Sequence, residues 1–185
     1  MKKSYKLTIC ALCIAIGCIL PTFFHMFGLG TAFSPLHFPS LLCGLICGPW
    51  YGMACGVLNP ILCSLFTGMP PVARLGYMVP EIACYGLFSG LFFRLLQGRR
   101  HSTPAEVGET SAKTLTRHLY IALVGALLIG KVVGGIFRAI LFTGGTYTVA
   151  LWATTFFVES LPGIVVQLIT IPLIYLALKK AKAIK

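Results

Sequence analysis

Residues 34–71 read "SPLHFPSLLCGLICGPWYGMACGVLNPILCSLFTGMPP" and decide the fold class. The segment contains no Asp, Glu, Lys or Arg, and His37 is its only charge-capable group, yet Pro and Gly interrupt it repeatedly. About a quarter of the residues of a soluble domain are charged. A stretch of this length without them is typical of a chain that lies in lipid.

The rest of the chain has the same character. Of its 185 residues, 57% are hydrophobic and 10% are charged, and the mean hydropathy is +0.90. A membrane-spanning helix needs roughly 20 residues, so the length suits about six spans. We therefore expect an all-α integral membrane protein, a compact bundle of six transmembrane helices in a single domain. The expected spans are 7–24, 35–48, 52–67, 77–96, 115–142 and 149–178, with a hydrophilic loop at 97–114. The second span is short, so it should be tilted, kinked or sheltered by its neighbours.

The net charge of +11 predicts the orientation of these spans. Most Lys and Arg residues fall in three groups, near the start of the chain, around residues 94–117 and at 179–185. Basic residues collect on the cytoplasmic side of membrane proteins. Both termini and the 97–114 loop should then be cytoplasmic, with Arg74 outside. A nucleic-acid partner is disfavoured, because no basic stretch carries interleaved aromatic residues.

The eight cysteines mostly lie in the middle of expected spans. Cys10 and Cys13 form a C-x-x-C pair, but no second pair or nearby His accompanies it, which is weak evidence for metal. Small apolar packing residues are the favoured interpretation, and we expect no metal site.

Four ionisable residues remain inside the expected spans, namely Glu81, Lys131, Arg138 and Glu159. A charge that faces lipid costs at least a few kcal/mol, so each should have a partner or a wet cavity. One interpretation is two salt bridges between helices. The other is a polar cavity, open to the outside, that binds a solute. Counted from the expected helix ends, Glu81 and Arg138 each lie about one turn in, and Lys131 lies deeper.

Other polar and aromatic residues could line the same cavity. These are His37, Asn59, Tyr85 and Trp152, although aromatic residues near a membrane surface are often only anchors. Pro60 follows Asn59 and frees a backbone carbonyl, a common device for binding polar ligands in membranes. The outer cations exceed the outer anions by one, which weakly favours an anionic substrate such as pantothenate, with Arg138 as its clamp.

The first span carries Ala11 and Ala15, four residues apart. Small residues at this spacing let a second helix approach closely. They serve either internal packing or docking to another protein.

The segments "SPLHFPSLLCGLICGPWYG", "LNPILCSLFTGMPP" and "VPEIACYGLFSGL" resemble the substrate-binding (S) components of energy-coupling factor (ECF) vitamin transporters. The resemblance implies a prokaryotic plasma-membrane protein that captures a micronutrient at its outer face. A transmembrane coupling subunit and two cytoplasmic ATPases would complete the transporter. It also implies that Ala11 and Ala15 contact the coupling subunit. Ligand would be held mainly by the loop between the first two helices and by the outer parts of the last three, where Glu81, Arg138 and Glu159 fall, with Lys131 deeper.

No G-x-x-x-x-G-K-[ST] motif occurs in the chain, so ATP would be used by the partners and no cofactor is expected here. A small ion-coupled carrier or channel, acting as an oligomer with Glu81 and Glu159 as proton sites, is the alternative. An enzyme is disfavoured, because Asp is absent and no catalytic spacing accompanies His37 or Glu159.

Overall fold

The computed structural model describes residues 3–26, 36–98, 109–141, 154 and 161–181. Six helices make up these residues and no strand occurs among them, which confirms the all-α class. They are α1 (Lys3–Met26), α3 (His37–Cys47), α4 (Pro49–Thr67), α5 (Val72–Gly98), α6 (Glu109–Leu141) and α8 (Leu161–Lys180). All but α3 are long and apolar enough to cross a membrane, so within the described ranges there are five candidate spans.

The break between α3 and α4 follows from two adjacent residues. Gly48 has φ 105°, a left-handed value that disfavours any residue with a Cβ. Pro49 begins α4, where its missing N–H leaves no helical hydrogen bond unmade. The chain therefore stops one helix and starts the next within two residues, and α3 has only 11 residues. It is the shortest helix of the described chain and most of its residues are buried, so its neighbours shelter it.

Two helices begin earlier than the apolar pattern indicates. α5 starts at Val72 rather than near Tyr77, and α6 starts at Glu109 rather than near Leu115. The hydropathy pattern marks only the part of a helix inside lipid, whereas residues such as Ala, Glu and Lys continue a helix beyond it. The expected 97–114 loop is consequently shorter, since its first two residues and residues 109–114 are helical.

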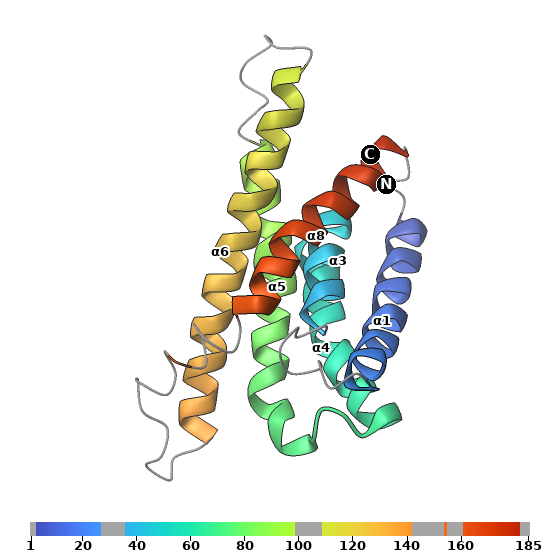
Figure 1. The fold of residues 1–185 in the computed structure, drawn as a ribbon, viewed down its shortest axis with the longest axis vertical. Helices are drawn as coiled ribbons and strands as arrows, with labels where there is room; N and C mark the ends of the chain where they lie inside the picture. Colours follow the sequence, from blue (N-terminus) through green and yellow to red (C-terminus); the bar gives the residue numbers. More distant parts are fainter. Residues whose placement is uncertain (1–2, 27–35, 99–108, 142–153, 155–160, 182–185) are drawn as a thin grey trace.

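α5 lies at the centre of the arrangement (Figure 1). It packs against α6 on one side and against α3 and α4 on the other, and α1 covers α3 and α4. α8 contacts α6 and α3. A methyl group added at Gly86 of α5 would overlap with the carbonyl of Gly52 on α4, and one added at Gly44 of α3 would overlap with the Gly86 carbonyl. The three inner helices α3, α4 and α5 are thus in direct backbone contact.

Four helix ends lie at the same end of the bundle. The start of α1, the end of α5, the start of α6 and the end of α8 all lie in the upper half of Figure 1. These are the helix ends that carry the three basic groups of the sequence. This arrangement suits the positive-inside rule. The orientation in the membrane remains a prediction.

The core and the lipid-facing surface are both apolar. Leu41, Ile82, Leu119 and Leu123 are completely buried between α3, α5 and α6. On the outer side of α6, large hydrophobic side chains are exposed at four-residue intervals, at Val124, Leu128 and Val132 and again at Ile136 and Ile140. An apolar exposed stripe of this kind suits contact with lipid chains.

Candidate functional site

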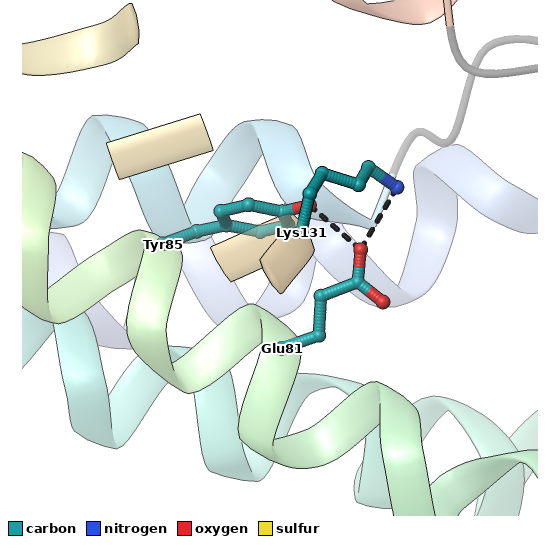
Figure 2. Close-up of polar contacts among 3 residues, drawn as sticks. All are labelled: Glu81, Tyr85 and Lys131. Carbon is teal, nitrogen blue, oxygen red and sulfur yellow. Dashed lines mark hydrogen bonds and ion pairs between the residues drawn. The ribbon is translucent and has the colours of Figure 1, made fainter. Parts of the chain in front are cut away.

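A buried ion pair joins α5 to α6. The Nζ atom of Lys131 lies 2.8 Å from Oε1 of Glu81. The Tyr85 hydroxyl, one turn along α5, donates a hydrogen bond of 2.6 Å to the same oxygen. Figure 2 shows both groups converging on this one oxygen atom. Only 9% of the Glu81 side chain and 16% of the Lys131 side chain are exposed, so the charges neutralise each other away from most of the solvent.

Two glycines on α6 make room for this group. A methyl added at Gly134 would lie 2.6 Å from Oε2 of Glu81. One added at Gly130 would overlap with the Tyr85 ring. Among the described residues, no donor reaches Oε2, which lies beside a surface without side-chain bulk at Gly134. The α5–α6 contact is thereby shaped around Glu81.

His37 brings a third helix to the group. It is the first residue of α3 and is buried. Its ring meets the Tyr85 ring edge-on, with centroids 4.9 Å apart and an interplanar angle of 60°. The structure therefore brings together four of the residues that the sequence nominated, from α3, α5 and α6. We call His37, Glu81, Tyr85 and Lys131 the Glu81 network.

Arg138 lies further along the same contact between α5 and α6. Its guanidinium carbon is 4.2 Å from the centroid of the Tyr77 ring, a cation–π arrangement. Tyr77 precedes Glu81 by one helical turn on α5, and Arg138 follows Lys131 by two turns on α6. The antiparallel helices α5 and α6 thus place two cations one after the other along their contact. Lys131 pairs with a carboxylate, and Arg138 stacks on an aromatic ring.

The depth expected for Glu81 is corrected by the helix bounds. Glu81 lies nine residues after the start of α5, and Lys131 lies ten residues before the end of α6. At about 1.5 Å per residue both are about 14 Å from these ends. The two groups are level and meet, because the early start of α5 places Glu81 deeper than one turn.

Asn59 lies elsewhere. It is completely buried on α4, and a methyl added at Gly17 of α1 would overlap with its side-chain amide. Neither polar atom of this amide has a partner within the described part of the chain. The contact between α1 and α4 thus holds a polar group that we had expected to line the cavity.

Of the remaining nominated residues, Trp152 and Glu159 lie outside the described residues. Arg74 is exposed near the start of α5. Sequence reasoning passed over Gln167 on α8, which is 3% exposed and whose Oε1 has no partner in the described ranges. In the sequence, Gln167 could have been noticed as a single amide residue inside an otherwise apolar span.

Ala11 and Ala15 point outward from α1. Both are exposed, so they do not serve packing inside this chain. Leu7 and Ile19, at the same four-residue spacing, are 64% and 68% exposed. Two small residues between two large ones form a notch on the outer face of α1. We refer to these four residues as the alanine notch.

These features define a multi-pass integral membrane protein with a charged network buried between its helices. The family model of the ECF transporter substrate-specific component matches residues 5–175, from the first turn of α1 to the last turns of α8, and the chain belongs to this family. Members of the family are transporter subunits rather than enzymes. No curated protein and no solved structure matches the chain.

Proposed function

We propose that this protein captures a small anionic micronutrient from outside the cell and delivers it inward with a coupling subunit and two ATPases. The family membership supports the role of a substrate-specific subunit. Pantothenate is the first compound to test, because it is a small carboxylate. The observation that supports an anion is the position of Arg138, which places a guanidinium on the same α5–α6 contact as the Glu81 network.

Lys131 already has its counter-charge, since Glu81 lies at 2.8 Å from it. Arg138 lies with its guanidinium over the Tyr77 ring. A guanidinium that stacks through its face can still donate through its edge, and its planar fork matches a carboxylate. We therefore assign Arg138 to the acidic group of the substrate and Lys131 to the support of Glu81.

The binding test uses the purified protein and radiolabelled pantothenate, with thiamine as the cationic comparison. Native mass spectrometry of the untreated protein identifies any small molecule that co-purifies. Arg138→Gln should weaken pantothenate binding by roughly 2–5 kcal/mol, as for a desolvated charge pair that loses one partner. Arg138→Lys should recover only part of this, because Lys lacks the fork. Arg74→Gln, an exposed arginine on α5, is the control. Unchanged binding in both Arg138 variants would remove Arg138 from the site.

The alanine notch is our candidate for the contact with the coupling subunit. Its two central residues are alanines, and its two outer residues are large, apolar and exposed. Helices in lipid associate by approaching each other closely at small residues of this kind. Replacing Ala11 and Ala15 together with Leu fills the floor. Energised uptake should be lost, whereas ligand binding by the isolated protein should not change.

The matched controls are Ala54→Leu and Ala139→Leu, which add the same bulk to exposed alanines of α4 and α6. These variants should transport normally. Uptake that needs no ATPase and collapses with the proton gradient would instead favour the ion-coupled carrier.

A further inference from the structure

Five buried cysteines form a cluster where α1, α3 and α4 meet. They are Cys10 and Cys13 of α1, Cys43 and Cys47 of α3, and Cys55 of α4. None of them forms a disulfide. The sulfur atoms of Cys10, Cys43 and Cys55 all lie within 4.8 Å of one another. One ligand from each of three helices therefore converges on a single point.

We propose that Cys10, Cys43 and Cys55 bind one Cu(I) ion. A planar site of three sulfurs with metal–sulfur bonds of about 2.3 Å separates the sulfurs by about 4 Å. The observed spacing needs only a small contraction to reach this value. Thiolate sulfur is a soft ligand that selects Cu(I). Structural zinc prefers four ligands, and the described residues bring only these three within mutual reach.

Hydrogen bonds hold the three sulfurs in place. The thiols of Cys10 and Cys43 both donate to the backbone carbonyl of Tyr51, at 3.7 Å and 3.6 Å. The Ser40 hydroxyl donates toward Cys55 Sγ at 4.0 Å. A donor at this position stabilises a thiolate and orients it, as outer-shell groups do in metal sites.

Two cations lie near the cluster and would offset part of the charge of the bound site. Three thiols would each release a proton to water, and three thiolates with one Cu(I) carry a net charge of −2. The Lys6 ammonium lies 5.9 Å from the centroid of the Tyr51 ring, beside the cluster. Arg94 donates to the carbonyl of Cys47 at 3.3 Å. Cys10 lies seven residues after the start of α1 at Lys3, so the site is about 10 Å from that helix end.

The sequence pattern pointed away from this site for an identifiable reason. The C-x-x-C pair of Cys10 and Cys13 lies on one helix and lacks a second pair. The three sulfurs that meet come from three helices and share no sequence motif.

The test is an anaerobic titration of the full-length protein in detergent with Cu(I), using bicinchoninate as the competing chelator. The wild type should withdraw one equivalent of Cu(I) from bicinchoninate and show the luminescence of a Cu(I)–thiolate centre. Cys55→Ala should bind Cu(I) at least roughly 100-fold more weakly, because losing a ligand exceeds the effect of losing an outer-shell partner.

Cys63→Ala is the matched control, since Cys63 is equally buried on the same helix but lies outside the cluster. It should bind as the wild type does. Cys10→Ser, on the peripheral helix α1, should repeat the loss if Cys55→Ala does not fold. A wild type that takes no Cu(I) from bicinchoninate would overturn the proposal, as would equal affinity in the Cys55 or Cys10 variant and the Cys63 variant.

Discussion

Replacing Glu81 with Gln removes the negative charge of the buried ion pair while it keeps the size of the side chain. Lys131 then remains 16% exposed beside a neutral amide instead of a carboxylate at 2.8 Å. Removing one partner of a buried pair destabilises a protein by about 3–5 kcal/mol. Because Lys131 keeps some exposure and the Gln oxygen can still accept from Tyr85, we expect the lower value, about 3 kcal/mol.

For a chain of this length, 1 kcal/mol corresponds to roughly 2–4 °C in Tm, so Glu81→Gln should lower the Tm by about 6–12 °C. The assay is differential scanning fluorimetry of the purified protein in one detergent. Lys131→Met removes the cation and keeps the apolar stem. The double variant should be more stable than the sum of the two single effects predicts, because it leaves no unpaired charge.

Two results would refute this reasoning. One is a Tm of Glu81→Gln within about 1 °C of the wild type, which would mean that the pair does not support the fold. The other is strict additivity in the double variant, which would mean that Glu81 and Lys131 act independently. Tyr85→Phe is a graded control, because it removes one hydrogen bond to a charged group, worth roughly 1.5–3 kcal/mol.

Three further predictions concern the core and the topology. Gly86→Ala should abolish or strongly reduce the yield of folded protein in size-exclusion chromatography, because the new methyl meets backbone atoms of α4, whereas Gly98→Ala, with no atom within 4 Å of the new methyl, should fold normally. Asn59→Leu should raise the Tm, since a buried amide without a described partner is replaced by an apolar group of similar shape; lost ligand binding would show instead that Asn59 serves the site. A fluorescent protein fused after Lys185 should fluoresce in the cytoplasm, and a Cys placed at Arg74 should react with an impermeant reagent from outside; a dark carboxyl-terminal fusion would contradict the topology.

The fold could be predicted to a large extent because the membrane restricts the choices. Segments without charges must be helical in lipid, and Gly48 with Pro49 marks the break between α3 and α4. The helix ends outside the apolar stretches could not be predicted in this way. Residues 109–114 are helical although they are polar, because helix formation there does not depend on burial.

The residues of the site could be predicted better than the contacts that they make with one another. Glu81 and Lys131 stand out because a charge in a span needs a partner. That they pair with each other depends on the register between α5 and α6, which is set by how the two helices pack. The outward position of Ala11 and Ala15 also depends on the whole fold, since spacing alone suits an inner or an outer face equally.

The backbone contacts among α3, α4 and α5 have a consequence for motion. Where Gly44, Gly52 and Gly86 touch, no flexible side chains lie between the helices to absorb a displacement. These three helices should therefore move as one rigid block. A change of shape during transport would then occur where side chains separate the helices, at the contacts of α1, α6 and α8 with that block. The Glu81 network spans one such boundary, between α5 and α6, and the alanine notch lies on α1, which is another of the parts free to shift.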